Sequence, residues 1–273
     1  MALLFLAPSI VLFAVFFFYP FEQLVLRGLY RNNAQGTNLR YIGWEQYKDV
    51  LTGDEFTHGL WHSVQYVLFT VPAGLVLGTL LAVAAHRKLR GIRIFQTIFS
   101  STVATSVAVA SVLFFVLLNS QNGVLKVNWL NDPDLALFGV SLSSIWQNLG
   151  LSFIIVLAGL QTVPTELMEA ATLDGYGPVR RFFRVTLPLI SPVLLVLVVV
   201  LVVFALQAFA QIELISRGGP NGHSETLVYK IFQRQTPDRL GEGSVMAVGL
   251  FVVTFVVTLG QFAILDRRVH YGD

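Results

Sequence analysis

Long apolar stretches without a charged side chain dominate this sequence. Each is at least as long as the roughly 20 apolar residues that a helix needs to cross a bilayer. The six stretches are Met1–Phe21, Ser63–Ala85, Ile94–Leu125, Leu135–Thr165, Val185–Ile212 and Gly243–Leu265. They are rich in Leu, Val and Phe and lack the sustained alternation of barrel strands. The pattern therefore predicts an all-α, polytopic membrane protein with six transmembrane helices.

We expect one membrane domain over residues 1–273. Its predicted spans lie at about 3–28, 61–85, 94–118, 141–161, 188–212 and 244–265. Composition agrees, because 55% hydrophobic and only 12% charged residues leave too little charge for the surface of a soluble domain. The first stretch has no basic leader and no small-residue cleavage pattern, so we expect a retained helix rather than a secretory signal. Whether residues precede Met1 stays open.

Lys and Arg residues indicate which side of the membrane each connecting segment faces. Segments 86–93, 162–187 and 266–273 carry Arg87, Lys88, Arg90, Arg93, Arg180, Arg181, Arg184, Arg267 and Arg268. The opposite segments carry as many Lys and Arg residues in about twice the length. Since cytoplasmic loops are enriched in these residues, we expect both termini and the 162–187 loop to be cytoplasmic.

The 162–187 loop, which contains the sequence "EAATLDGYGPVRRFFRVTLP", is the longest of these cytoplasmic segments. Pro164 suits the first turn of a helix, Glu166 suits the positive end of its dipole, and Gly175 and Gly177 stop it, which predicts a short helix over 164–174. One face of this helix carries Leu167, Ala170, Ala171 and Asp174. The loop is either a solvated connector or a docking element, and a short alanine-faced helix favours docking to a cytoplasmic partner.

Several motifs resemble one protein family. Glu169-Ala170-Ala171, Gly175 and Leu187-Pro188 are similar to the EAA loop of permease subunits in binding-protein-dependent ABC importers. The resemblance continues in "LAPSIVLFAVFFFYP", "IWQNLGLSFIIVLAGLQTVP", "GGPNGHSETLVYKIF" and "QFAILDRRVHY", which together look like the carbohydrate-uptake class. Within it, "LVYKIFQ" and "RRVHY" are most similar to the first permease subunit of glycerol-3-phosphate or glycerophosphodiester importers.

The resemblance implies a type I ABC importer permease fold, in which the 164–174 helix is a coupling helix that sits in a cleft of an ATPase subunit. The residues implied at that contact are Glu166, Glu169, Ala170, Ala171, Asp174 and Gly175. Implied partners are a second permease subunit, two ATPase subunits or an ATPase dimer, and an external substrate-binding protein, in a prokaryotic inner or plasma membrane. ATP and Mg²⁺ would bind the ATPase subunits and this chain would hold no cofactor. The sequence contains no G-x-x-x-x-G-K-[ST] phosphate loop, which agrees with ATP binding on a separate subunit.

Polar residues in the later spans are candidates for the substrate pathway. Gln207 and Gln211 are four residues apart, so we expect them on one helix face. Other candidates, near the outer end of the fourth span, are Trp146, Gln147 and Asn148. Amides and an aromatic face suit a polyhydroxylated ligand, although the glutamines could instead join helices. The resemblance favours Gln207, because the family segment matching 204–211 contributes to the pocket.

The absence of ionisable groups in the six stretches argues against a proton relay and favours an external energy source. On the outer side, residues 218–222, "GGPNG", form a turn cluster. By the resemblance, the binding protein would contact Gly218, Gly219, Pro220 and Asn221, although a plain exposed loop is the alternative. For a phosphorylated ligand, the cation nearest the outer mouth is Arg217. Sugar and glycerophosphodiester substrates both stay open.

Two pairs of residues spaced four apart, one of histidines and one of glycines, say little about function. His58 and His62 have the spacing of metal ligands, but Gly-Leu-Trp lies between them where zinc motifs place a Glu, so we expect an interfacial anchor and no metal site. Gly74 and Gly78 fit close helix packing. No nucleic-acid-binding pattern is present. Two rivals to a transport subunit stay open: a membrane enzyme acting on a lipid-linked substrate, and a structural membrane subunit.

Overall fold

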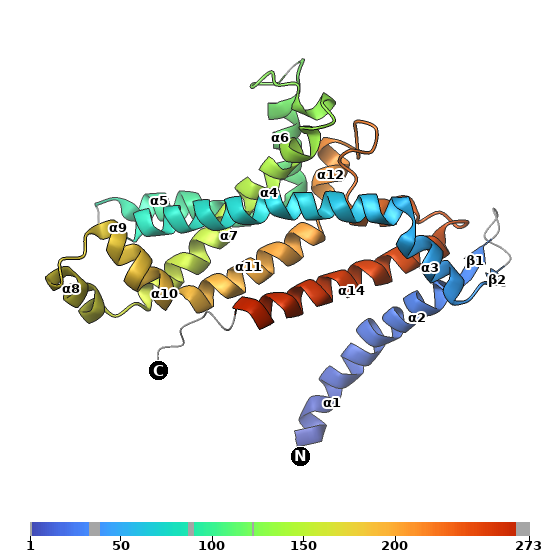
Figure 1. The fold of residues 1–273 in the computed structure, drawn as a ribbon, viewed down its shortest axis with the longest axis horizontal. Helices are drawn as coiled ribbons and strands as arrows, with labels where there is room; N and C mark the ends of the chain where they lie inside the picture. The colour runs from blue at the N-terminus through green and yellow to red at the C-terminus, as the bar shows by residue number, and fades with distance from the viewer. Residues whose placement is uncertain (1, 33–38, 87–89, 122, 266–273) are drawn as a thin grey trace. The chain divides into compact units, whose positions relative to one another are not determined.

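The computed structural model describes residues 2–32, 39–86, 90–121 and 123–265 (Figure 1). The chain forms two compact units. The first comprises Met1–Trp61 and Thr226–Thr254, and the second comprises His62–Glu225 and Phe255–Asp273. Two long helices, α4 (Asp54–Ala85) and α14 (Leu240–Leu265), contribute residues to both units.

The first unit begins with a nearly continuous helix. It consists of α1 (Ala2–Phe13), a π-helical turn η1 (Ala14–Phe18) and α2 (Tyr19–Arg27). None of its membrane-spanning window is buried within the chain, and Phe16 is 74% exposed. An apolar helix of this kind is stable only where lipid or another subunit covers it, which agrees with the predicted first span.

A short hairpin and a helix follow. Strands β1 (Tyr30–Asn32) and β2 (Leu39–Tyr41) pair in antiparallel register, with Tyr30 opposite Tyr41. Helix α3 (Trp44–Thr52) is tied back to α2 because the Tyr47 hydroxyl donates a 2.8 Å hydrogen bond to the Val25 carbonyl oxygen. Burial of Tyr47 raises the pKa of its phenol.

The core of the first unit is built by α4, α13 (Leu227–Gln233) and α14. Its fully packed members are Phe56, Leu227 and Met246. Around them lie the partly buried side chains of Val50, Leu51, Leu60, Ile231 and Leu250. A Cβ added at Gly249 would lie only 2.6 Å from the Leu51 side chain and 2.7 Å from the Phe56 ring, so α14 approaches α3 and α4 closely.

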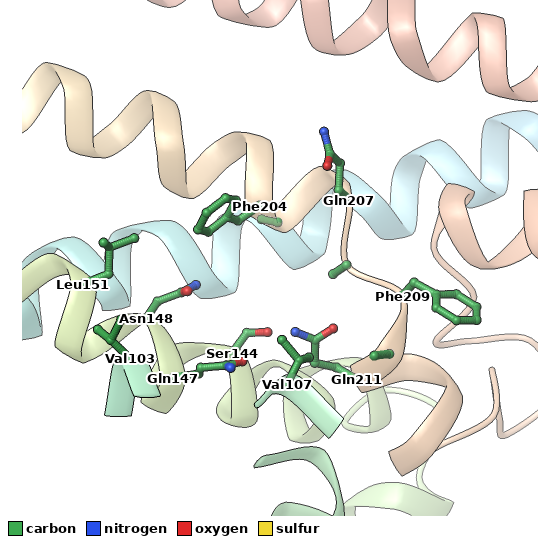
Figure 2. A pocket seen from close by; sticks show the side chains of 13 residues that line it. Val103, Val107, Ser144, Gln147, Asn148, Leu151, Phe204, Gln207, Phe209 and Gln211 are labelled. Carbon is green, nitrogen blue, oxygen red and sulfur yellow. The ribbon is translucent and has the colours of Figure 1, made fainter. Parts of the chain in front are cut away.

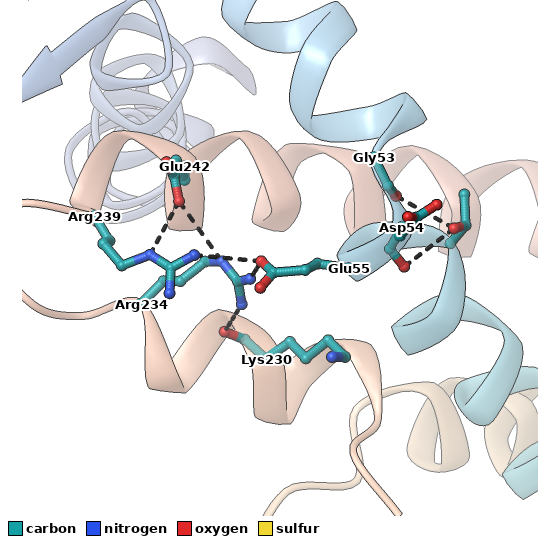
Figure 3. Close-up of polar contacts among 8 residues, drawn as sticks. Gly53, Asp54, Glu55, Lys230, Arg234, Arg239 and Glu242 are labelled. Carbon is teal, nitrogen blue, oxygen red and sulfur yellow. Dashed lines mark hydrogen bonds and ion pairs between the residues drawn. The ribbon is translucent and has the colours of Figure 1, made fainter. Parts of the chain in front are cut away.

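An ion-pair cluster joins the same elements at their polar ends (Figure 3). The Arg234 side chain is 3% exposed; it pairs with Glu55 and donates to the Lys230 carbonyl oxygen at 2.9 Å. Arg239 pairs with Glu55 at 3.3 Å and with Glu242 at 3.1 Å. Burial lowers the pKa of Arg234, as does the charge of Arg239, whereas Glu242 raises it. Because Glu55 accepts from both arginines, it links α4 to the segment between α13 and α14.

The second unit is organised around α7 (Ala136–Gln161), half of whose span is buried. Helix α7 contacts α5 (Ile92–Ser100), the 3₁₀ turn η2 (Ser101–Ala104), α6 (Val107–Leu118), α11 (Ser191–Leu206) and α12 (Ala210–Ile215). A 3₁₀ turn η3 (Trp129–Asn131) precedes α7. Between α7 and α11 lie α8 (Thr165–Leu173), α9 (Pro178–Arg181), a π-helical turn η4 (Phe182–Thr186) and α10 (Leu187–Leu189).

Within the second unit, α4 packs against α7 at the predicted pair of glycines. A Cβ on Gly78 would collide with the Cβ of Ser152, and would lie 3.2 Å and 3.3 Å from the Ser152 carbonyl carbon and Cα. One turn earlier, a Cβ on Gly74 would meet only ordinary contacts at 3.7 Å or more. The expectation of close helix packing is confirmed, and Gly78 is the residue that requires it.

In the part of the chain that the structure describes, four helices are long and apolar enough to cross a membrane, or six if each of two bent pairs is one span. Of the single helices, one over Phe5–Arg27 lies within the predicted span 3–28, and three lie on the predicted spans 61–85, 141–161 and 244–265. The predicted spans 94–118 and 188–212 each fall on a pair of helices separated by a break, not on one single helix. These regions are bent by 102° between η2 and α6 and by 73° between α10 and α11.

Local chemistry explains both bends. Thr105 and Ser106 are extended, and the Ser106 hydroxyl caps α6 by accepting from the Val109 N–H at 3.3 Å. In the first turn of α11, Pro192 has no N–H to give to the Pro188 carbonyl oxygen, which accepts a hydrogen bond from the Ser191 hydroxyl at 2.7 Å instead. Hydropathy does not reveal such breaks, because the residues that make them are compatible with a membrane span.

Candidate functional site

A cavity of about 590 Å³ lies in the second unit where two helices are interrupted (Figure 2). It is bounded by η2, α6, α7, the end of α11 and the start of α12. Its lining residues are Val103, Val107, Ser144, Gln147, Asn148, Leu151, Phe204, Ala205, Gln207, Ala208, Phe209, Ala210 and Gln211. Among the residues that the structure describes, this lining is apolar with five amide or hydroxyl side chains and no charge, as is usual for sites that bind small polar molecules.

The break between α11 and α12 brings two of the predicted pathway residues to this cavity. Helix α11 ends at Leu206, Phe209 leaves the helical region with φ −127° and ψ −57°, and α12 begins at Ala210. The prediction that Gln207 and Gln211 share one helix face is therefore wrong, because the helix is interrupted between them. Both nevertheless line the cavity, and Figure 2 shows the Gln207 amide pointing away from the α7 side chains.

Helix α7 supplies the other polar residues from one face. Ser144, Gln147, Asn148 and Leu151 recur at helical spacing. Ser144 shares a 2.7 Å hydrogen bond with the hydroxyl of Tyr66 on α4, so its position is fixed. Ser144 was not predicted as a site residue, although its spacing from Gln147 and Asn148 was a signal that could have found it.

Gln147 has a structural task at the edge of the cavity. Its amide nitrogen donates a 2.9 Å hydrogen bond to the carbonyl oxygen of Thr105, at the bend between η2 and α6. Irregular backbone at membrane depth needs such a partner, because lipid offers none. Gln147 therefore stabilises the bend that forms one wall of the cavity.

Trp146 does not line the cavity. Its ring packs against Phe114 of α6, with ring centroids 6.0 Å apart. Of the predicted pathway residues, the structure thus brings Asn148, Gln207 and Gln211 together and leaves Trp146 in the packing between α6 and α7. Neighbours in a helix point in different directions, so a run of three polar or aromatic residues cannot all face one site.

Three amides in the cavity are available to a ligand. Within the residues that the structure describes, the side chains of Asn148, Gln207 and Gln211 form no hydrogen bond with protein groups. An amide offers two donors and one carbonyl acceptor, which suits hydroxyl groups. The cavity can therefore bind a small polar solute between amide groups and the apolar faces of Phe204 and Phe209.

The predicted docking loop contains α8 at Thr165–Leu173, close to the expected 164–174. Pro164 is not in the first helical turn as predicted but precedes it as the N-cap, with an extended ψ of 134°. Gly175 has φ +78°, a left-handed conformation that ends the helix and favours glycine. The loop continues into α9, where the Arg181 guanidinium donates to the Thr172 hydroxyl at 2.6 Å.

The residues of this loop differ in exposure. The predicted coupling residues that are exposed are Glu166, Glu169, Ala170, Asp174 and Gly175. Ala171 is only 5% exposed, and its carbonyl oxygen accepts the Tyr176 N–H at 2.9 Å. The alanine-faced stripe is therefore split, because Ala171 packs within its own loop while Ala170 faces outward.

The predicted external turn is held from inside by Ser224. Its hydroxyl donates to the Gly219 carbonyl oxygen at 2.6 Å and bonds the Ser216 hydroxyl at 2.8 Å. Gly218 is buried, Gly219 and Pro220 are half-buried, and Asn221 is exposed. Nearby Arg217 is also exposed and does not line the cavity.

The two histidines with metal-ligand spacing have different surroundings. His62 Nδ1 lies 3.1 Å from the Glu225 carbonyl oxygen and its ring stacks near His223, whereas His58 is exposed. Within the described ranges, no group of three or more His, Cys, Asp or Glu residues could hold a metal ion.

These features match one class of membrane protein. The chain belongs to the family of binding-protein-dependent transport system inner membrane components, whose profile matches residues 74–271. It is therefore a bacterial inner-membrane transport subunit and not an enzyme, which removes the two rival readings of the sequence.

Individual relatives narrow the resemblance. The chain is similar to the sn-glycerol-3-phosphate transport system permease protein UgpA of Agrobacterium fabrum, with 32% identity over 98% of this chain and 96% of the relative. It is 30% identical to the protein of the same name from Escherichia coli O157:H7, over 98% of this chain and 95% of the relative.

Solved structures show the same fold. A chain of a bacterial ABC transporter for import of the acidic polysaccharide alginate superposes with a TM-score of 0.82 at 21% identity, covering 96% of this chain and 94% of that chain. A chain of the MetNI methionine ABC transporter superposes with a TM-score of 0.59 at 14% identity, covering 79% and 96%. The family match and these superpositions confirm the expected type I importer permease fold.

Proposed function

We propose that this chain forms half of the translocation pathway of an ATP-driven importer, as one membrane domain over residues 1–273, and that the cavity at the helix breaks contacts the transported solute. The observation that carries this proposal is the set of three amides, Asn148, Gln207 and Gln211. Among the described residues these amides have no protein partner, and the lining of the cavity holds no charge. Broken helices near the middle of the bilayer are where transporters place solute sites, because the ends of the helices expose backbone groups.

The solute is a small polar molecule, either a sugar or glycerol-3-phosphate or a glycerophosphodiester. The relatives named for sn-glycerol-3-phosphate transport support the second class. The uncharged cavity suits the hydroxyl groups that both classes carry. An external substrate-binding protein delivers the solute and contacts the turn at 218–221, where Asn221 is the most accessible residue.

Six spans, with α11 as the fifth, put both termini and the 162–187 segment on the same side of the membrane, which we assign as cytoplasmic. Arg180, Arg181 and Arg184 in that segment support this orientation. Of the other predicted signals, Arg90 and Arg93 lie within the described residues, and Arg87, Lys88, Arg267 and Arg268 lie outside them.

Helix α8 couples this chain to a separate ATPase subunit, which binds ATP and Mg²⁺. The exposed carboxylates of Glu166, Glu169 and Asp174 are available to basic groups of that partner, and a charge-assisted contact gains strength where the cleft excludes water. ATP-driven closure of two ATPase subunits would move α8, and through it the helices of this chain and of a second permease subunit. The solute cavity would then open alternately to each side.

Reconstitution of the complete complex tests this function. We expect Asn148→Ala to lower solute-stimulated ATP hydrolysis and uptake together, because the solute loses a contact in the pathway. Trp146→Phe is the matched control, since Trp146 lies on the same turn of α7 but does not line the cavity. Equal uptake by wild type and Asn148→Ala would count against the cavity as the pathway.

Coupling through α8 has a separate readout. We expect Glu169→Gln to retain assembly but to reduce uptake per ATP hydrolysed. Thr172→Ser, on the same helix, keeps its hydroxyl and the charge of the helix and serves as the control. If Glu169→Gln assembles normally and transports with an unchanged ratio, α8 does not couple through this carboxylate.

A further inference from the structure

A second cavity, of about 510 Å³, lies between α5 and α7, at the end of α7 that leads into α8. Helix α5 contributes four polar residues, Arg93, Gln96, Thr97 and Ser100. Helix α7 contributes Gln161 beside apolar side chains such as Phe153. The function proposed above does not use this cavity.

The two cavities follow the same helix faces. On α7, the lining positions of the first cavity, 144, 148 and 151, continue at 154, 158 and 161 in the second. On α5 and η2, positions 93, 96 and 100 of the second cavity lead to 103 of the first. Residues three and four apart share a helix face, so the same faces of α5–η2 and of α7 contribute to both cavities. Asn148 and Gln161 are about 20 Å apart along the axis of α7.

Arg93 distinguishes the second cavity chemically. It is the sole charged residue among those that line either cavity in the described parts of the chain. Arg93 is exposed, and its guanidinium forms no ion pair with any described residue. A planar guanidinium with five N–H donors matches the geometry of a phosphate group.

The neighbouring polar groups differ in availability. Gln96 donates to the Ala85 carbonyl oxygen at 3.1 Å, and Thr97 and Ser100 donate to backbone oxygens of their own helix at 2.9 and 2.6 Å. The Gln161 amide forms no hydrogen bond with described residues and faces the cavity from α7. Arg93 and Gln161 are therefore the donors that a ligand can recruit.

We propose that this α5–α7 cavity binds a phosphate group, with Arg93 as the cation and Gln161 as an additional donor. Resting on the function proposed above, the phosphate belongs to a solute that has left the uncharged first cavity and moves toward the end of α7 that leads into α8. A phospholipid head group carries the same chemistry, so the experiment separates the two sources. This site supplies the positive charge that the first cavity lacks.

The solute arm uses proteoliposomes of the complete complex with ATP in the lumen and loaded binding protein outside. Uptake of labelled sn-glycerol-3-phosphate is measured against increasing unlabelled sn-glycerol-3-phosphate in the lumen. We expect Arg93→Gln to raise the luminal concentration for half-inhibition about three- to tenfold, the size for one partly solvated charge-assisted contact. Arg93→Lys should retain part of the inhibition. Arg90→Gln is the matched control, since it removes the same charge nearby but does not line the cavity.

The lipid arm uses delipidated complex in detergent, incubated with phosphatidylglycerol and examined by native mass spectrometry. If the head group is the source, Arg93→Gln loses one bound phospholipid relative to Arg90→Gln and luminal solute has no effect. Identical behaviour of Arg93→Gln and Arg90→Gln in both arms overturns the phosphate site. Failure of the wild type to take up any solute refutes the proposed transport function instead, and the lipid arm still decides the site.

Discussion

The contact between Gly78 of α4 and Ser152 of α7 yields the sharpest prediction about the membrane-embedded part of the fold. Replacing Gly78 with Ala places a methyl group against the Ser152 Cβ, with the Ser152 carbonyl carbon 3.2 Å away. Backbone atoms cannot rotate out of the way as a long side chain can, so the two helices must separate. The same replacement at Gly74 meets the nearest atom, Cδ1 of Leu201, at 3.7 Å, which is an ordinary contact.

The magnitude follows from this difference. Overpacking by one methyl group in a packed interior costs about 1–3 kcal/mol, while both substitutions share the same change in helix propensity. We therefore expect Gly78→Ala to be about 1–3 kcal/mol less stable than Gly74→Ala. Ser152→Gly removes the opposing Cβ, so the double variant Gly78→Ala/Ser152→Gly should recover part of that loss.

Thermal unfolding of the purified complex in detergent, followed by loss of soluble oligomer, measures the difference. Gly74→Ala is the control for helix propensity, and Ser152→Gly alone is the control for the double variant. Equal melting of Gly78→Ala and Gly74→Ala would refute the close approach of α4 and α7. An absence of coupling between Gly78→Ala and Ser152→Gly would show that the strain arises elsewhere.

Three further predictions concern other parts of the chain. Glu55→Gln should destabilise the first unit by about 1–2 kcal/mol in thermal unfolding, because buried Arg234 loses its nearest carboxylate while the exposure of Glu55 limits the effect. Gln147→Leu should cost about 1–3 kcal/mol in the same assay, since the Thr105 carbonyl oxygen at the bend loses its donor. Gly175→Ala should destabilise the loop after α8 by about 1–2 kcal/mol, seen as faster proteolysis there, because its φ is +78°.

The chain offers matched controls for two of these predictions. Asp54→Asn removes a neighbouring exposed carboxylate that forms no ion pair with described residues, and it should leave unfolding unchanged. Gly177→Ala is the control for the loop, because Gly177 has φ −64° and open space around it. Unchanged unfolding of Glu55→Gln or Gln147→Leu, or equal proteolysis of the two glycine variants, would contradict the respective contacts.

The long spans could be predicted from the sequence because charge-free length is a property of composition. Helices α4, α7 and α14 therefore appear where expected. The bends could not be predicted in the same way, because they depend on which group satisfies each backbone carbonyl. Ser106, Pro188 and Pro192 were visible in the sequence, but such residues also occur in uninterrupted membrane helices.

The candidate cavity was predicted in part for the wrong reason. Gln207 and Gln211 both line it, yet through an interruption of the helix and not through shared helical spacing. Trp146 was misplaced because sequence proximity to Asn148 does not establish direction. From the sequence, Arg93 indicated only which side of the membrane its segment faces. Its place in a cavity with Gln161 could not be predicted, because it depends on how α5 packs on α7.

The hydrogen bond from Gln147 to the Thr105 carbonyl has a consequence for recombination between relatives. The bend between η2 and α6 is stabilised by the Gln147 side chain, which lies on α7 and is 42 residues after Thr105 in the sequence. A chimera joined anywhere between these positions would inherit the interruption from one parent and its stabilising donor from the other. Functional crossovers in this family should therefore keep both positions together, so the 105–147 interval would be exchanged as a block.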